Sequence, residues 1–178
     1  DADALVETLN RHFGADGIAF RAVAPDQWLM ESDAPIEAST SAPEAAHALS
    51  IEAHLPQGPQ ARRLKQIGNE AQMLFHDCQV NQAREARGEA VINSLWFWGA
   101  GQHRPLSPRP AQTAFGNDPL LRGLAREAGM SAAGLPLDAA QWLASAPQNG
   151  IAWFALDALS AAADYGDNAR WLAQLARL

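Results

Sequence analysis

The sequence predicts an α/β protein in which helices pack on a mixed sheet. Two apolar runs, residues 91–98 (VINSLWFW) and 151–156 (IAWFAL), are rich in branched and aromatic side chains, as is typical of interior strands covered on both faces. Strands and helices alternate in the second half of the chain, which favours neighbouring strands in one sheet. The first half combines a hairpin with helices and is less regular, so an α+β arrangement is the alternative class.

The length of 178 residues predicts one domain, 1–178, that buries a substantial core. Because the sequence starts at Asp1 rather than Met, the alternative is a fragment of a longer chain. A net charge of −7 argues against a nucleic-acid partner, which needs a basic surface. The single cysteine fits a reducing compartment, here the cytoplasm. No apolar run reaches the length of a membrane span, so no membrane partner is expected.

The first half is predicted to begin with a helix over residues 1–13, whose apolar side chains recur at four-residue spacing. Short strands at 18–23 and 28–31 flank a turn with Pro25 at its second position, which indicates a hairpin. A short helix is expected at 43–48.

A longer amphipathic helix is predicted over residues 59–78. Its apolar face is formed by Ala61, Leu64, Ile67, Ala71, Leu74, Phe75 and Cys78. Beside that face, within an arc of about 60°, we expect a polar stripe at the margin of burial. The stripe consists of Lys65, Asn69, Gln72 and His76. Residues in this position either meet a ligand or pair with neighbouring loops, since buried polar groups need partners.

Asn81, Arg84 and Arg87 follow at three-residue spacing, which places them on one face of a short helix. Two guanidiniums this close form a clamp for a carboxylate or phosphate. The alternative is that these arginines are structural ties to backbone carbonyls or to the carboxylates of Glu85, Glu89 and Asp157.

The run 91–98 ends in a Gly-Ala-Gly turn, at the strand end where ligands gather in open α/β sheets. We therefore expect a pocket for a small anion near this turn. Its expected ligand-binding residues are Asn69, Gln72, His76, Asn81, Arg84, Arg87, Asn93, Gly99 and Gly101. Residues 101–110 follow with three prolines and are predicted to be a loop or linker.

Three further helices are predicted in the second half. The first covers 118–130, with Asp118 as its cap and Pro119 at its first position. A shorter one runs from 138 to 144. The last is capped by Asp167 or Asn168, and its buried face is expected to contain Trp171, Leu172, Leu175 and Leu178.

The segments HDCQVNQAREARG and INSLWFWGAG resemble a block of proteobacterial regulatory proteins of the RpfE type. Those proteins are similar to the archaeal-type, cofactor-independent phosphoglycerate mutases of the alkaline-phosphatase-like superfamily. In the enzymes a His, a Val-Asn pair, an Arg and Gly-x-x-x-x-Asn lead into a strand that ends in Gly-x-Gly. The matching positions here are His76, Val80, Asn81, Arg84, Gly88, Asn93, Gly99 and Gly101.

The resemblance implies chemistry through a serine or threonine nucleophile and two metal ions held by Asp and His clusters. A two-metal site needs several converging ligands. The histidines of this chain are scattered instead, at His12, His47, His54, His76 and His103. No catalytic residue, metal ligand or cofactor is therefore predicted.

Three functions are open at this point. The chain is expected to be a noncatalytic, phosphoglycerate-mutase-like binding or regulatory module for a small phosphorylated or carboxylated anion. The first alternative is a fragment of a metal-dependent enzyme of the mutase type, whose metal and nucleophile residues lie outside this chain. The second is a protein-interaction domain with a structural polar core and a protein partner.

Overall fold

The computed structural model describes residues 1–46, 50–107, 111–145, 150–156, 163 and 166–175. The α/β class is confirmed: these residues form six α-helices, a two-stranded antiparallel sheet and a three-stranded parallel sheet. The strands are thus divided between two sheets. The chain forms two compact units, Asp1–Gln102 and His103–Leu178, and the boundary falls within the segment 101–110. No helix among the described residues is long and apolar enough to cross a bilayer.

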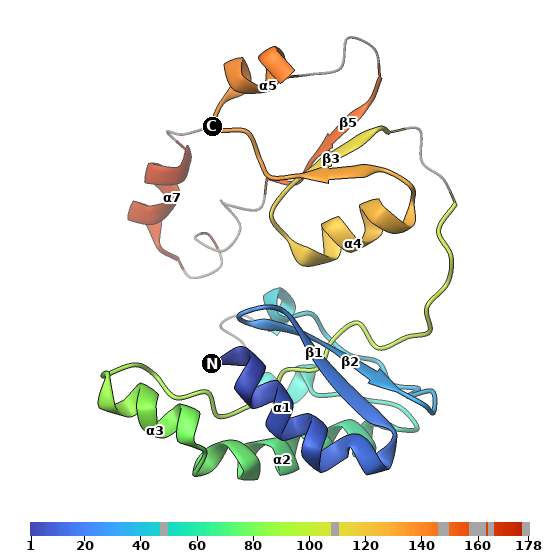
Figure 1. The fold of residues 1–178 in the computed structure, drawn as a ribbon, viewed down its shortest axis with the longest axis vertical. Helices are drawn as coiled ribbons and strands as arrows, with labels where there is room; N and C mark the ends of the chain where they lie inside the picture. The colour runs from blue at the N-terminus through green and yellow to red at the C-terminus, as the bar shows by residue number, and fades with distance from the viewer. Residues whose placement is uncertain (47–49, 108–110, 146–149, 157–162, 164–165, 176–178) are drawn as a thin grey trace. The chain divides into compact units, whose positions relative to one another are not determined.

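The first unit is built from three α-helices and one hairpin (Figure 1). The helix predicted at 1–13 and the hairpin are confirmed, and the described part of the segment 43–48 is a 3-10 helix. In chain order its elements are α1 (Ala2–Phe13), η1 (Gly14–Asp16), β1 (Ile18–Ala24), β2 (Gln27–Ser32), η2 (Pro43–Ala46), η3 (Ile51–His54), α2 (Ala61–His76) and α3 (Gln79–Ala86).

The core of the first unit collects the apolar faces of α1, β1 and α2. The rings of Phe13 and Phe20 lie 5.9 Å apart, and Trp28 meets Phe75 edge-on at 6.3 Å. The helical spacing read from the sequence therefore identifies the buried face of both helices correctly. The buried core residues are Leu5, Val6, Leu9, Phe13, Ile18, Phe20, Ile67, Ala71 and Phe75.

Two polar side chains fasten α1 to its neighbours. Asn10 Nδ2 donates to the Phe20 carbonyl at 2.9 Å, and the Phe20 amide donates back to Asn10 Oδ1 at 2.6 Å. One carboxamide thus satisfies both backbone groups of a β1 residue, as a neighbouring strand would. On the other side, His12 Nε2 lies 2.9 Å from Glu70 Oε2 of α2, and this hydrogen bond lowers the pKa of the Glu70 carboxyl.

The prediction of a buried strand at 91–98 is wrong. The segment has no regular secondary structure, and Val91 and Trp98 at its ends are exposed. A strand needs a neighbour for its backbone, and no described strand pairs with this run. The apolar pattern reflects packing on the core of the first unit, where Ile92, Leu95 and Phe97 make contact.

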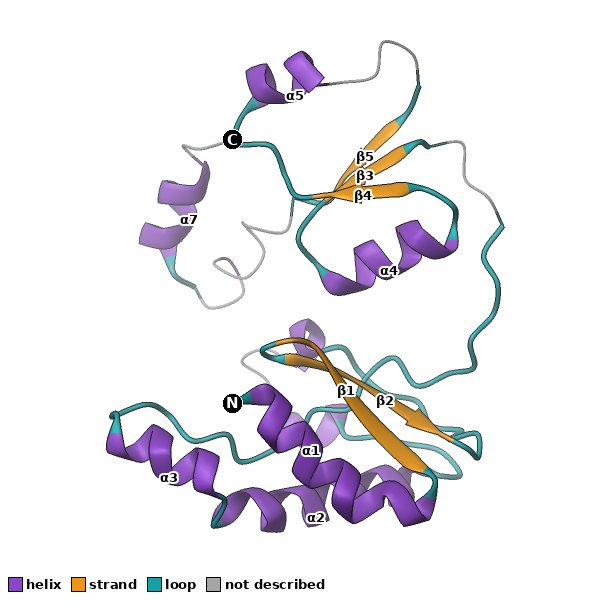
Figure 2. Cartoon of the chain, viewed as in Figure 1, coloured by secondary structure: helices purple, strands orange, loops and turns teal. Residues whose placement is uncertain are grey.

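The second unit contains a small parallel sheet of order β4-β3-β5 (Figure 2). Thr113 on the central strand is paired with Ser131 on one side and Ala152 on the other. Sequence reasoning missed β3 and β4 because a strand of three residues is too short to show a period. The elements in chain order are β3 (Thr113–Phe115), α4 (Pro119–Glu127), β4 (Ser131–Ala133), α5 (Ala139–Ser145), β5 (Ala152–Phe154) and α7 (Asn168–Leu175).

The predicted cap of α4 is confirmed, because Asp118 Oδ1 accepts a hydrogen bond from the Leu120 amide at 2.6 Å. Asp138 and Asp167 act in the same way at the starts of α5 and α7. The helix predicted through residue 130 ends at Glu127, since the chain turns into β4.

Two expectations for the second unit need correction. The run 151–156 is not an interior strand: β5 pairs only with β3 among the described strands, and Trp153 is exposed. The expected buried face of α7 is also absent, because Leu172 and Leu175 are exposed. In the run 151–156, Phe154 meets Trp142 of α5 edge-on at 5.3 Å, and this contact still leaves Trp153 exposed. Asp157 and Leu178 lie outside the described residues.

Replacing Phe75 with alanine is expected to lower the free energy of unfolding of the first unit by about 3–5 kcal/mol, because the ring is completely buried. Met73 on the same helix is 77% exposed, and Met73→Ala should change it by less than about 0.5 kcal/mol. Urea unfolding followed by circular dichroism measures both. Equal losses would contradict the assigned core.

Candidate functional site

The polar stripe of α2 lies on its solvent face rather than at the margin of burial. Lys65, Asn69, Gln72 and His76 are all exposed, because no helix or strand of the described chain covers that side of α2. Gln72 contacts the loop that follows α3, since its Nε2 donates to Ser94 Oγ at 3.2 Å. His76 faces Asp77 at 3.9 Å, with both side chains largely in solvent.

Asn81 is the buried polar residue of this region. Its side chain is positioned by the break between two helices: α2 ends at His76, and Cys78 Sγ accepts from the Asn81 amide at 3.5 Å to begin α3. Asn81 Nδ2 donates to the carbonyls of Phe75 at 2.8 Å and Ile92 at 2.7 Å, while the Ile92 amide donates to Oδ1 at 2.9 Å. These bonds use both donors and one acceptor position of a side chain that is 4% exposed, so Asn81 has a structural role.

Arg84 and Arg87 are brought together at the end of α3. Arg84 Nε donates to the Ala90 carbonyl at 2.7 Å, and its Nη1 lies 3.3 Å from Glu89 Oε2. Arg87 holds Glu89 through both carboxylate oxygens, at 2.8 and 2.9 Å. The hydrogen bond from Arg87 lowers the pKa of the Glu89 carboxyl, which keeps this group ionised.

A second carboxylate lies between the two arginines. Asp1 Oδ2 accepts from Arg84 Nη1 at 2.8 Å and from Arg87 Nη2 at 3.4 Å. The Arg84 side chain is 22% exposed and that of Arg87 is 47% exposed, so the fork is accessible from solvent. Two guanidiniums that converge on one oxygen provide the geometry of an oxyanion site. We call the pair Arg84 and Arg87 the arginine fork.

The structure does not gather the nine predicted residues in one pocket. Asn81 is internal, the arginine fork lies at the end of α3, and the stripe on α2 faces solvent. Asn93, Gly99 and Gly101 are exposed along the loop that follows, where Gly99 has a φ of 67°. The spacing of Asn81, Arg84 and Arg87 was informative, because they do share the helix α3 and its end. Their partner Asp1 carries no sequence signal, since it lies 83 positions away.

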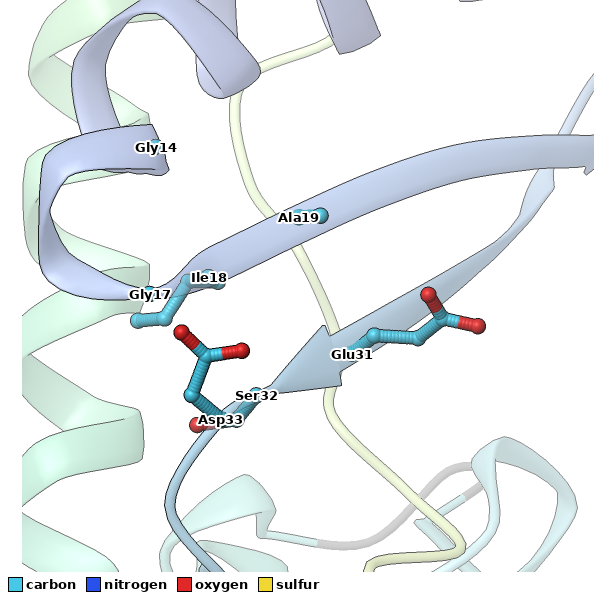
Figure 3. A pocket seen from close by; sticks show the side chains of 7 residues that line it. All are labelled: Gly14, Gly17, Ile18, Ala19, Glu31, Ser32 and Asp33. Carbon is cyan, nitrogen blue, oxygen red and sulfur yellow. The ribbon is translucent and has the colours of Figure 1, made fainter.

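A separate cavity of about 270 Å³ lies at the open end of the hairpin and contains none of the predicted residues. Figure 3 shows that the carboxylate of Asp33 lies next to Gly17, whereas Glu31 is further along β2. Gly17 has a φ of +70°, and a Cβ there would come within 2.6 Å of Asp33 Oδ2. Glycine is therefore needed for the turn into β1. The cavity is lined by Gly14, Gly17, Ile18, Ala19, Glu31, Ser32 and Asp33.

No group of three or more His, Cys, Asp or Glu side chains among the described residues is arranged to hold a metal ion. The thiol of Cys78 is the N-cap of α3 and is half-buried.

Replacing Asn81 with alanine is expected to destabilise the first unit by about 2–3 kcal/mol, because it leaves the amide and the carbonyl of Ile92 without partners. Asn93→Ala is the matched control, since Asn93 is exposed. Urea unfolding should separate the two variants. Identical unfolding midpoints would show that the carboxamide is dispensable.

No model of a known protein family matches the chain. A probable 2,3-bisphosphoglycerate-independent phosphoglycerate mutase of Geobacter sulfurreducens is 36% identical over 53 residues, which are 30% of this chain and 13% of the relative. The solved cofactor-independent phosphoglycerate mutase of Thermoplasma acidophilum aligns over 96% of this chain and 53% of that one, with a TM-score of 0.43 and 16% identity. The chain is therefore similar, weakly and over part of their length, to cofactor-independent phosphoglycerate mutases.

Proposed function

We propose that this chain is a noncatalytic, phosphoglycerate-mutase-like module that accepts a small phosphorylated or carboxylated anion at the arginine fork, in a cytoplasmic regulatory role of the RpfE type. The observation that carries the proposal is the Asp1 carboxylate oxygen held at 2.8 and 3.4 Å from Arg84 and Arg87. An oxygen of this charge and size already occupies the place that a phosphate or carboxylate oxygen would take.

The noncatalytic part of the proposal rests on how the resembling block uses its polar groups. Asn81 is buried and hydrogen-bonded to the backbone of Phe75 and Ile92. Arg84 Nε donates to the Ala90 carbonyl, and this hydrogen bond fixes the guanidinium. The terminal nitrogen Nη1 then faces the place of an anion. The block thus forms a binding fork, and the carboxylates beside it, those of Glu89 and Asp1, are ion-paired with the arginines.

The fork binds an external anion in competition with Asp1. Glu89 stays bound through its two-pronged contact with Arg87, which neutralises one of the two positive charges. The second positive charge of the fork attracts one anionic oxygen, which either Asp1 or a ligand supplies. Removing the Asp1 charge therefore favours the ligand.

Asp1→Asn is expected to strengthen the binding of 3-phosphoglycerate or inorganic phosphate roughly fivefold, because a partly exposed ion pair is worth up to about 1 kcal/mol. Isothermal titration and the ligand-induced shift of the melting temperature measure the effect. Asp3→Asn is the matched control: it removes the same charge from the exposed first turn of α1, where Asp3 forms no ion pair with either arginine of the fork.

Arg84→Lys should abolish the gain seen in Asp1→Asn, since an ammonium group does not reproduce the planar contacts of the guanidinium. The proposal fails if neither anion shifts the melting of wild type or of Asp1→Asn. Arg84 would then be a structural tie of Asp1, Glu89 and the Ala90 carbonyl.

A second candidate is a fragment of a metal-dependent enzyme of the mutase type. The observation that favours it is the partial match, which covers 13% of the curated relative. In that case the metal ligands and the nucleophile belong to additional chain. A longer reading frame carrying a Ser or Thr nucleophile and an Asp and His cluster would support this candidate.

This chain is expected to show no phosphoglycerate mutase or phosphatase turnover when Mn²⁺, Co²⁺ or Mg²⁺ is added. The physical reason is that metal-assisted phosphoryl transfer needs several converging ligands. A coupled assay with 3-phosphoglycerate and a chromogenic phosphate ester measures this. Turnover that rises with metal, and that co-purifies with the protein through two columns, would refute the noncatalytic proposal.

A further inference from the structure

The end of α3 places a carboxylate beside the arginine fork. The helix closes with a Schellman turn, in which the Gly88 amide donates to the Glu85 carbonyl at 2.9 Å. The Glu89 amide donates to the Arg84 carbonyl, also at 2.9 Å. Gly88 has a φ of 72°, the left-handed conformation that such a turn needs. The backbone itself therefore directs Glu89 back toward the two arginines.

The Glu89 carboxylate contacts both guanidiniums. Its two oxygens accept from Arg87 at 2.8 and 2.9 Å, and Oε2 lies 3.3 Å from Arg84 Nη1. The same Nη1 donates to the Asp1 carboxylate at 2.8 Å. An anion that takes the place of Asp1 therefore shares this nitrogen with Glu89. It lies within the roughly 4–6 Å over which a like charge disfavours a second one.

The charges of this group match an anion with a single negative charge. Arg84 and Arg87 carry two positive charges, and Glu89 and Asp1 balance them. A carboxylate in the place of Asp1 keeps this balance. A phosphate monoester carries about −1.5 to −2 at pH 7, and its second charge finds no uncancelled positive charge in the fork. That charge lies near Glu89 instead, and it also costs more to remove from water.

The nitrogens that remain for a ligand also suit a small group. Arg84 Nε is bound to the Ala90 carbonyl, and Arg87 Nε is bound to Glu89. Neither arginine can then bind a phosphate side-on through its Nε, which is one way in which guanidiniums grip such groups with two parallel bonds. The fork offers Arg84 Nη1 and Arg87 Nη2, which converge on one oxygen.

We propose that Glu89 is a specificity-determining residue of the arginine fork, which it biases toward singly charged anions such as a carboxylate and against doubly charged phosphate monoesters. Arg84 and Arg87 supply the attraction, and Glu89 repels a second negative charge from the side. This inference rests on the proposed function and narrows it. Of the two kinds of anion named there, it assigns the carboxylate to the fork.

Three small anions separate charge from shape in a test on the full chain. Acetate and dimethyl phosphate carry one negative charge, whereas methyl phosphate carries two at about pH 8, since its second pKa is about 6. The Asp1→Asn variant is used so that Asp1 does not compete. NMR titration of the arginine Nε–H signals at low ionic strength gives the dissociation constants, because salt screens exposed charges. Acetate and dimethyl phosphate are expected to bind at least as tightly as methyl phosphate.

Glu89→Gln in the same background is expected to strengthen methyl phosphate roughly fivefold relative to both singly charged anions, because it removes an exposed like charge beside the ligand. The glutamine keeps an oxygen that accepts from Arg87. Glu85→Gln is the matched control, since Glu85 is exposed on the same helix and its side chain forms no ion pair with a described residue. It should leave the ratio of dissociation constants unchanged. Circular dichroism verifies that each variant is folded.

The outcomes distinguish this inference from the proposed function on which it rests. The role of Glu89 is refuted if methyl phosphate binds tightest while Glu89 is present, or if Glu89→Gln leaves the ratio unchanged. An equal change in Glu85→Gln refutes it as well. In each of these cases anion binding at the fork still stands. If none of the three anions moves the arginine signals, the proposed function fails together with the inference.

Discussion

The carboxamide of Asn81 is the buried polar contact around which the loop after α3 is arranged. It lies 4% exposed between the last turn of α2 and the loop after α3, and it joins Phe75 to Ile92 through three hydrogen bonds. A buried amide left unpaired is costly, so these bonds fix the path of the loop. The position of Ile92 in turn brings Leu95 and Phe97 onto the core.

Two asparagine side chains of the first unit each pair with both backbone groups of one distant residue. Asn10 pairs with both backbone groups of Phe20, and Asn81 does so with Ile92. A side-chain amide carries N–H donors and a carbonyl acceptor side by side, so it can pair with both backbone groups of one residue as a neighbouring strand would. At Phe20 it satisfies the outer edge of a real hairpin. At Ile92 it satisfies the first residue of a segment that has the sequence of a strand and no sheet around it, which explains why that segment stays attached to α2.

The two units differ in how much apolar volume they bury. The first has a core of large side chains, with Phe13, Phe75 and several leucines fully enclosed. In the described part of the second, the buried cluster consists of Ala111, Ala114, Ala125 and Met130, while Trp153 and Leu172 are exposed. Because stabilisation scales with the apolar area removed from water, the described contacts hold the first unit together more strongly. The arginine fork belongs to this firmer unit.

The sequence by itself determined the local elements: the faces of α1 and α2, the hairpin around Pro25 and the cap at Asp118. Periodicity and caps act between residues a few positions apart, so a single sequence displays them. It also showed that Asn81, Arg84 and Arg87 belong to one helix or its end. Only the tertiary structure decided that Arg84 meets Asp1, and that the run 91–98 has no strand beside it. Both depend on segments far apart in the chain, and hydrophobicity alone does not distinguish a strand within a sheet from a loop packed on a helix.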